Sequence, residues 1–476
     1  MIKIMIKENA ITFKELEKRV FKDICKIGQE CTRELLEQYD QMLMQERNRG
    51  KYRHKGYRKT VIKTVYGEVE YRRAVYEVTE EDGFRHFVFL LDETLELDHV
   101  GFISTNMAEL MVKSVTEMSY RECAAKVTEM TGQSISAMGV WNVIQSLGEK
   151  VCQDERDLID EHKKGHIQGD YVTPVLFEEA DGVYVNLQGK DRQENHHGKA
   201  EIKVAIAYDG WKKEGKGRYK LHEQVAVAGF SRSKEFQDYR EAVIADKFNL
   251  DEVQTRILNG DGGSWIKKVK DKDTVFQLDP FHKNKAVREL IHDKKAQQAV
   301  LELLNGKNIT GLFEYLEIYK TSISEAKDIT DAETLIRYYM NNREGLLPYQ
   351  DQVEKMPDAP EGIEYLNLGT MENHIWSIIA RRMKHNHTSW SKRGGHNLAK
   401  ILAKKCSGKL YEVTEKLRRP VFEEERVAEI YEPIISSAKV SKTSGHGYEY
   451  PVLGHVVGLD YETRGNRHKL NVIAGY

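Results

Sequence analysis

The sequence has little cysteine and no long apolar run. No stretch of its 476 residues approaches the roughly 20 consecutive apolar residues of a membrane span. Lys3, Lys7 and Glu8 interrupt the first residues, so we expect no signal peptide. The absence of any C-x-x-C pair excludes a disulfide scaffold and a ribbon-type zinc site, and it suits a cytoplasmic protein. The five cysteines are Cys25, Cys31, Cys123, Cys152 and Cys406.

The sequence also lacks internal repeats, low-complexity segments and the G-x-x-x-x-G-K-S/T pattern of a nucleotide-binding loop. With 40% hydrophobic and 31% charged residues, it has the balance of a globular protein, and its mean hydropathy of -0.61 agrees. At about 150 residues per domain, the length predicts about three domains. The net charge of -2 is a sum over opposite signs and says nothing about partners.

The N-terminal third is predicted to hold two units. In residues 1–98, apolar positions at helical spacing continue to about residue 49, and a basic β-hairpin with a turn at Gly67 follows. The segment 87–97 is predicted to add a strand. Residues 99–165 outline a helix-turn-helix, whose second helix is capped by Ser136 and runs from Ala137 to about Lys150.

The rest of the chain is predicted to be a mixed α/β or α+β core with a helical insertion. Residues 166–282 alternate strands and helices, and 172–188 is predicted to be two strands about an Asp-Gly turn. Residues 283–365 form the helical insertion, 366–411 the last helix of the core and a basic segment, and 412–476 an irregular tail.

Two aspartates follow apolar strand segments. Asp181 comes after Val175-Leu176-Phe177, although taken alone it is better explained as a residue that shapes an Asp-Gly turn. Asp261 ends a short apolar strand at a glycine-rich corner, a common place for a site in an open α/β sheet. A plain turn explains Asp261 equally well.

A third acidic position, Asp279, precedes Pro280 and is well explained as the cap of a helix. His282 is one strand away from the Asp261 corner, so it is a candidate site residue, with a surface histidine as the alternative.

Glu372 is the most informative residue on physical grounds. At helical spacing it shares one stripe with Trp376, Ile379 and Met383, which are large and apolar. A carboxylate that faces a core needs a partner or a metal to offset desolvation. The alternative is an exposed acid in the first turn, where the helix dipole favours it. Three separated carboxylates on core elements predict a site for Mg²⁺ or Mn²⁺, with two ions able to act on a phosphodiester.

Basic residues gather in two stretches. Residues 47–73 hold ten Lys or Arg against Glu68 and Glu70, with tyrosines interleaved. Between Glu372 and Glu412 there are nine Lys or Arg, four His and no acid. A charge run is usually a solvated face. Together with the helix-turn-helix outline, however, these stretches make nucleic acid the leading partner.

These pieces resemble the ISLre-type insertion-sequence transposases of bacteria, which are akin to Mutator-like DDE transposases. The similar segments are EADGVYVNLQ at Asp181, NGDGGSWIK at Asp261, LDPFHK at Asp279 and His282, and MENHIWSIIARRMK at Glu372, followed by SWSKRGGHNLAKIL. The spacing of the three acids, 80 and then 111 positions, fits families with a helical insertion before the last acid. The likeness is specific over 172–405 and weaker in the tail.

The resemblance implies an RNase H-like catalytic domain whose acidic triad is Asp181, Asp261 and Glu372, with His282 beside it in a D-x-x-H motif. It implies a triad that holds two Mg²⁺ ions, a water that cuts the element end, and a freed 3′-OH that attacks target DNA. The helix-turn-helix and the hairpin would bind the terminal repeats. We expect the protein to act on the nucleoid as a homodimer or larger oligomer. The predicted DNA-binding residues are Arg53, Lys55, Arg58, Lys59, Arg72, Arg73, Arg381, Arg382, Lys384, Lys392 and Arg393.

Two other classes of function stay open on the sequence. A non-catalytic DNA-binding regulator needs the helix-turn-helix but has no use for an acid on the apolar stripe at Glu372. An RNase H-like nuclease hydrolyses DNA without joining strands, and a strand-transfer assay separates it from a transposase.

Overall fold

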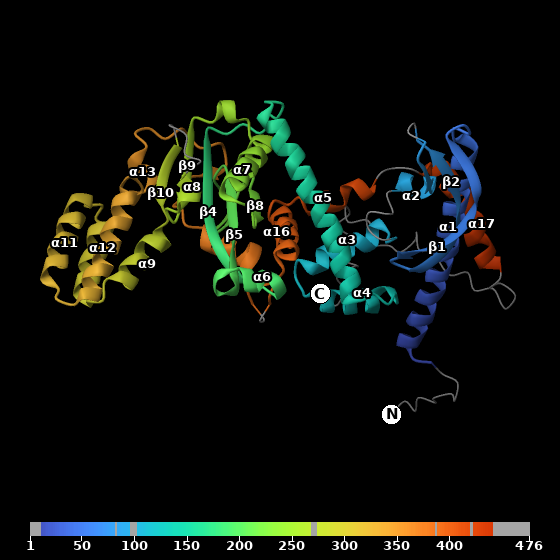
Figure 1. The fold of residues 1–476 in the computed structure, drawn as a ribbon, viewed down its shortest axis with the longest axis horizontal. Coiled ribbons are helices and arrows are strands. Elements are labelled where there is room, and N and C mark those ends of the chain that lie inside the picture. The colour runs from blue at the N-terminus through green and yellow to red at the C-terminus, as the bar shows by residue number, and fades with distance from the viewer. Residues whose placement is uncertain are drawn as a thin grey trace.

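The structure, a computed structural model, describes residues 11–80, 83–95, 102–267, 274–385, 388–418 and 422–440. The molecule is elongated, with the N-terminal elements at one end, a sheet in the middle and a group of helices at the other end (Figure 1). The predicted mixture of helices and strands is confirmed. None of the helices in these ranges combines the length and the apolar character that a membrane crossing requires.

The predicted N-terminal helix and basic hairpin are both present. Helix α1 (Phe13–Glu46) begins at a capping box in which Thr12 and Glu15 each accept a hydrogen bond from the other's backbone N–H. Strands β1 (Tyr52–Thr64) and β2 (Gly67–Thr79) pair antiparallel, and the sheet order β1-β2-β3 leaves β1 at an edge.

The strand predicted over 87–97 is wrong beyond its start. Strand β3 ends at Val88 (Arg85–Val88), and helix α2 (Leu90–Leu95) follows. Asp92 lies in the first turn of α2, where the helix dipole favours an acid, and it is buried against Arg73 with an N–O distance of 2.8 Å. Residues 96 and 97 lie outside the described ranges.

The helix-turn-helix outline is present, with a longer second helix than predicted. After α3 (Thr105–Val115), α4 (Tyr120–Thr131) ends at Gly132, whose φ of 69° is left-handed. Ser136 caps α5 as predicted, but α5 continues to Lys163 (Ala137–Lys163). Its buried face extends beyond the predicted end because Val151 packs in the central core and Glu155 pairs with Lys400 at 2.6 Å.

A five-stranded mixed sheet lies in the middle of the molecule, in the order β10-β9-β4-β5-β8. The pairs β4–β5 and β5–β8 are antiparallel, whereas β4–β9 and β9–β10 are parallel. The strands are β4 (Val175–Asn186), β5 (Lys199–Tyr208), β8 (Val225–Gly229), β9 (Thr255–Gly260) and β10 (Thr274–Leu278).

The hairpin predicted over 172–188 is wrong. Strand β4 runs unbroken through Asp181 and Gly182, and these two residues pair with Val204 and Lys203 of β5. Gly182 does not have a left-handed φ, so the Asp-Gly pair forms no turn. The pairing of β4 with β5, which continues on both sides of these residues, overrides the local turn preference.

Helices cover both faces of the sheet. Helix α7 (Ser233–Lys247) packs on one face against β5 and β8. Helices α14 (Met371–Ile375) and α16 (Lys392–Cys406) pack on the other face, against β4 and β8. Short elements complete this part: α6 (Gly189–Glu194), β6 (Trp211–Gly215), β7 (Arg218–Leu221), α8 (Ser264–Lys267), α13 (Tyr349–Gln352) and β11 (Ile363–Glu364).

Helices fill most of residues 283–341, as the sequence predicts, and they share a core with the sheet. Buried Val287, Leu312 and Tyr339 of the insertion belong to one apolar cluster with Leu258 and Phe276 of the strands. The insertion helices are α9 (Pro280–Leu290), α10 (Lys294–Asn305), α11 (Ile309–Ser322) and α12 (Ala326–Asn341).

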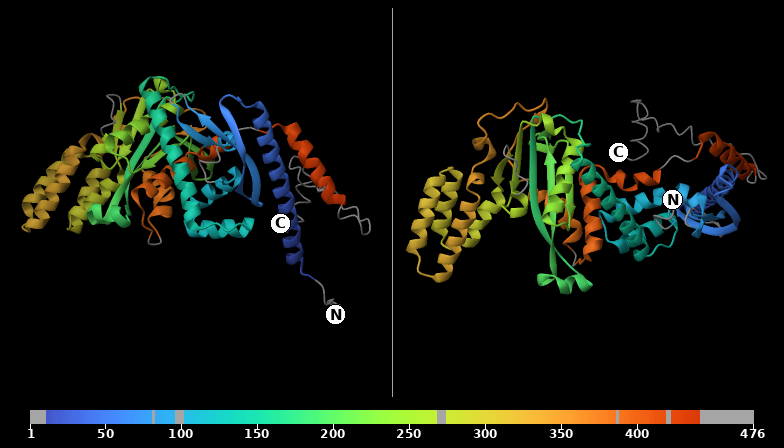
Figure 2. Two further views of the ribbon diagram at one scale, coloured as in Figure 1. Left: turned by 45° about the vertical axis from the view of Figure 1, so that its right-hand side comes forward. Right: turned by 45° about the horizontal axis from the view of Figure 1, so that its top comes forward.

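The C-terminal part of the chain returns to the N-terminal end of the molecule. After the 3-10 helix η6 (Leu410–Arg418), helix α17 (Glu424–Val440) lies beside α1 in every view (Figures 1 and 2). The rings of Tyr39 and Phe422 are 5.2 Å apart, centre to centre. Residues 441–476 of the predicted tail lie outside the described ranges.

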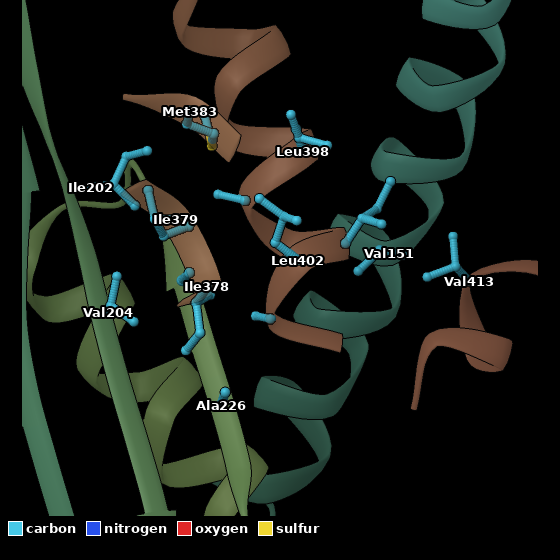
Figure 3. Packing of buried hydrophobic residues seen from close by; sticks show 14 of the residues in the cluster. Val151, Ile202, Val204, Ala226, Ile378, Ile379, Met383, Leu398, Leu402 and Val413 are labelled. Atoms are coloured by element: carbon cyan, nitrogen blue, oxygen red, sulfur yellow. The ribbon is translucent and has the colours of Figure 1, made fainter. Parts of the chain in front are cut away.

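The stripe predicted from Glu372 to Met383 is wrong in its first half. Glu372 and Trp376 are exposed, whereas Ile379 and Met383 are buried in the main core, between β5 and α16 (Figure 3). The cause is the π-helical turn η5 (Trp376–Ala380), which lies between α14 and α15 (Arg381–Met383) and changes the phase of the helix.

Candidate active site at the ends of the parallel strands

Three aspartates lie in one row across neighbouring parallel strands. Gly260 of β9 pairs with Ala180 of β4 on one side and with Leu278 of β10 on the other. Each of these three residues is followed directly by an aspartate: Asp181, Asp261 and Asp279. The register of the sheet therefore brings together three acids that are far apart in the sequence.

Asp181 is the most buried acid of the predicted triad, with 9% of its surface exposed. Its Oδ1 accepts a hydrogen bond of 2.7 Å from the Gly182 N–H. The pKa of Asp181 is raised to about 6, because burial and, to a smaller extent, the charges of Asp261 and Asp279 outweigh the lowering effects of His282 and of the Gly182 N–H. A nearby positive charge would therefore stabilise the ionised form of Asp181.

Asp261 lies at the predicted glycine-rich corner. Its Oδ1 accepts from the Gly263 N–H at 2.7 Å, and its carbonyl accepts from the Tyr338 hydroxyl of α12 at 2.8 Å. Gly262 takes a left-handed φ of 86°, so the corner depends on a glycine there. The helical insertion therefore helps to hold the second acid in place.

His282 lies between two of the aspartates. Its Nδ1 is 3.1 Å from Asp279 Oδ2, and its Nε2 is 3.9 Å from Asp181 Oδ2. The hydrogen bond with Asp279 is the largest effect that raises the pKa of His282, and Asp181 and Asp261 add to it. Asp279 caps α9 as predicted, and hydrogen bonds from His282 and Asn259 lower its pKa despite its burial.

Glu372 lies on the helix that covers this face of the sheet. Its neighbour Met371 and the later Ile375 are buried in the same core as Phe177 and Val183 of β4, while Glu372 itself is exposed. The oxygens of Asp181, Asp261 and Glu372 are not gathered within 4.8 Å of one another. The structure brings Asp181, Asp261 and His282 together, whereas Glu372 is exposed on α14, which packs against β4.

A second cluster of possible metal ligands lies among the helices that follow β10. Among the described residues, ligand atoms of His292, Asp328 and Asp331 lie within 4.8 Å of one another. His292 Nε2 is 3.0 Å from Asp331 and 3.8 Å from Asp328. Ion pairing between α12 and the turn before α10 accounts for these contacts.

The sequence reasoning missed a buried carboxylate, Glu179, that lies two residues before Asp181 on the same face of β4. It is fully buried and accepts hydrogen bonds from β5, β9 and the loop before α14. Asn259 of β9 donates to both Glu179 and Asp279, at 2.8 and 3.0 Å. The available signal was the position of Glu179 two residues before Asp181, on the face of the strand that also carries the apolar Phe177 and Val183.

Most of the predicted DNA-binding residues are exposed. On the hairpin these are Arg53, Lys55, Arg58, Lys59 and Arg72, and near α16 they are Arg381, Lys384, Lys392 and Arg393. Lys59 pairs with Glu70 at 2.6 Å, and Lys55 pairs with Glu77. Strand β1 is at an edge of this sheet, and on its outer side Lys63 forms a bridge with Ile103.

Arg73 and Arg382 are corrections to the predicted set, because both are buried. Arg73 is 7% exposed, pairs with Asp92 and lies 3.9 Å from the centre of the Phe89 ring. Arg382 is 8% exposed and donates to the Val115 carbonyl at 2.6 Å. Burial lowers the pKa of Arg382. Both charges act within the fold and are not available to a phosphate.

The acid-free window after Glu372 does not make an acid-free surface. Acids from other parts of the chain pair with its cations: Glu117 with Arg381 and Lys405, and Glu149 with Arg393. Glu412 in turn pairs with Lys404 and Lys409. A DNA phosphate would have to compete with these partners.

The fold and the site define a mixed α/β protein with a group of carboxylates at the ends of parallel strands. A family model described as "Uncharacterised protein family (UPF0236)" matches residues 6–419, and the chain belongs to this family.

Relatives with the same family name occur in at least two genera. A UPF0236 protein of Caldanaerobacter subterraneus subsp. tengcongensis is 26% identical over 419 residues, covering 85% of this chain and 80% of the relative. Its printed name joins eleven locus designations of that organism. A "UPF0236 protein in vanSb 3'region" of Streptococcus gallolyticus is 23% identical over 360 residues, covering 73% of each chain.

Proposed function

We propose that this protein is the DNA transposase of a bacterial insertion sequence, which cuts and joins DNA through Asp181, Asp261 and Glu372. The observation that carries the proposal is the placement of Asp181 and Asp261 next to each other across two parallel strands. The helix with Glu372 covers the face of β4 that Asp181 shares with Phe177 and Val183.

The proposal includes an RNase H-like catalytic core. It is supported by a five-stranded mixed sheet in which an antiparallel run, β4-β5-β8, is joined to the two parallel strands β9 and β10. Helices on both faces and a helical insertion before α14 fit the same interpretation.

The donor set suits a hard divalent cation. Asp181, Asp261 and Glu372 offer only carboxylate oxygens, which are the ligands that Mg²⁺ and Mn²⁺ prefer. The raised pKa of Asp181, about 6, reflects burial beside other acids, and a cation there would offset that cost. When bound, two such ions would supply the charge that stabilises the attacking and leaving oxygens of a phosphodiester.

In this proposal the protein positions groups and moves protons. Asp181 and Asp261 are held rigidly by backbone N–H groups one and two residues further along the chain. His282, whose pKa is raised chiefly by its hydrogen bond with Asp279, lies beside Asp181, where its imidazole can exchange a proton and orient a phosphate or a water. Positioning and charge neutralisation provide most of the rate enhancement.

The DNA partner is proposed from the exposed cations of the hairpin and from the α4–α5 pair. Arg53, Arg58 and Arg72 are exposed on a sheet whose edge strand is β1. Because two element ends must be joined together, we propose that at least two copies of the protein assemble on DNA. The eleven loci in the name of one relative fit an element that copies itself within a genome.

The direct test is a strand-transfer assay. The protein is incubated with Mg²⁺, a labelled duplex that carries the end of its own element, and a supercoiled target plasmid. We expect the label to be covalently joined to the plasmid. Cutting without joining would favour an RNase H-like nuclease, and binding without cutting would favour a non-catalytic regulator. Either result would overturn the proposal.

A further inference from the structure

Glu179 is a buried carboxylate that five hydrogen-bond donors surround. The hydroxyls of Tyr208 and Thr370 donate to Oε1 at 2.7 and 2.5 Å. The Asn259 side chain donates to Oε2 at 2.8 Å, and the backbone N–H groups of Gly369 and Thr370 donate to the same oxygen at 3.1 Å each. Glu179 has no exposed surface.

Glu179 and four of its five donors lie close in the sequence to the acids of the proposed site. Glu179 is two residues before Asp181 on β4, and Asn259 is two residues before Asp261. Thr370 is two residues before Glu372. Asn259 also donates to Asp279, which in turn holds His282. The hydrogen bonds of Glu179 therefore reach the segments that carry Asp261 and Glu372, and through Asn259 and Asp279 they reach His282.

The free-energy cost of breaking the hydrogen bonds to Glu179 restrains the loop that precedes α14. A buried charge without hydrogen-bond donors is strongly unfavourable, so any shift of the Gly369–Thr370 loop away from β4 removes three of the five donors. The loop has few ways to move while α14 remains on the sheet. This restraint acts at the start of α14, two residues before Glu372.

We propose that Glu179 is a positioning residue that fixes the start of the Glu372 helix against β4 and so sets the place of Glu372 relative to Asp181 and Asp261. The inference rests on the proposed transposase function. Glu179 does not itself act as a metal ligand, because it is fully buried and both of its oxygens already accept hydrogen bonds.

The test compares two substitutions of Thr370. Thr370→Val keeps the shape of the side chain and removes the hydroxyl that donates to Glu179, whereas Thr370→Ser keeps the hydroxyl. For Thr370→Val we expect kcat for DNA cleavage to fall roughly 10- to 100-fold, because small displacements of reacting groups are costly. We also expect the half-saturating Mg²⁺ concentration to rise, with unchanged affinity for the duplex and an unchanged circular dichroism spectrum.

A second substitution separates positioning from metal binding. In Glu179→Gln the amide oxygen can accept from the three N–H donors, and the amide nitrogen can donate to the two hydroxyls. We expect this variant to keep most of the cleavage activity. A loss as large as that of Asp181→Ala would overturn the inference, since it would mean that the charge of Glu179 acts directly on the reaction.

The outcomes distinguish this inference from the proposed function. If the wild-type protein cuts no duplex with Mg²⁺ or Mn²⁺, the proposed function fails. If the wild type cuts, and Thr370→Val cuts with the same kcat and Mg²⁺ dependence as Thr370→Ser, only the inference about Glu179 fails. If Thr370→Val loses activity only in proportion to lost folded protein, the role of Glu179 is merely structural and the inference is also overturned.

Discussion

Asp181 of β4 and Asp261 after β9 are neighbours across two parallel strands, each one residue beyond the last pair that the strands form, Ala180 with Gly260. The sequence separates these aspartates by 80 positions, and only the parallel pairing of their strands brings them together.

Removal of the Asp181 carboxylate is expected to abolish cleavage and leave DNA binding intact. Asp181→Ala should lower the cleavage rate by on the order of 100-fold or more, as loss of a group that stabilises charge in the reaction does. Binding should persist, because the exposed cations of the hairpin are untouched. Cleavage and gel-shift assays measure the two effects. Glu314→Ala, at an exposed acid of the insertion, is the control that should change neither.

Asp181→Asn is expected to stabilise the metal-free protein at high pH. Because burial raises the pKa of Asp181 from 3.8 to about 6, the folded state holds this proton more tightly than the unfolded state. The contribution of Asp181 to stability is therefore present below pH 4 and is lost as the pH rises through 6. Asparagine avoids the loss, so urea unfolding should show a gain of up to about 3 kcal/mol at pH 8. An equal gain at pH 4 would contradict this explanation.

His282→Gln is expected to make metal binding more sensitive to acid. The charge of His282 lowers the pKa of Asp181, so its removal should raise that pKa. Protons then compete with Mg²⁺ at higher pH. Calorimetric titration from pH 5 to pH 8 should show the half-loss of Mg²⁺ affinity at a higher pH in the variant than in the wild type. A shift to lower pH would exclude this role of His282.

Arg73 and Arg58 are expected to respond in opposite ways to substitution. Arg73→Ala removes the buried ion pair with Asp92 and should destabilise the fold by about 3–5 kcal/mol. Arg58→Ala removes an exposed cation and should weaken DNA binding and reduce its salt dependence with little change in stability. Thermal unfolding and salt-dependent binding measure the two effects. Weakened binding by a stable Arg73→Ala protein would contradict the correction made for Arg73.

The sequence predicted features that depend on local signals. The cap at Ser136, the turn at Gly67 and the cap at Asp279 all act within a few residues of their own position. The helical insertion was likewise predictable, because a long segment with helical spacing and no strand signal has few alternatives. The candidate site residues Asp261 and His282 were found because strand ends precede them.

The failures of prediction come from contacts that are distant in the sequence. Asp181 and Gly182 look like a turn, but their pairing with Val204 and Lys203 of β5 keeps them extended. The Glu372 stripe assumed a regular helix, and the π-helical turn at Trp376–Ala380 changes its phase. The stretch between Glu372 and Glu412 holds no acid, but Glu117 and Glu149 pair with its cations although they are more than 240 positions away in the sequence. No local pattern reports such partners.

The most direct test of the central claim is cleavage of a labelled duplex that carries the end of the element, with Mg²⁺, with Mn²⁺ and with EDTA. The wild type is compared with Glu372→Ala and with Glu361→Ala, a change at an exposed acid before the same helix. We predict metal-dependent cutting by the wild type and by Glu361→Ala, and loss of cutting with retained binding in Glu372→Ala. Equal cutting by all three proteins, or cutting that persists in EDTA, would contradict a metal-dependent acidic triad that includes Glu372.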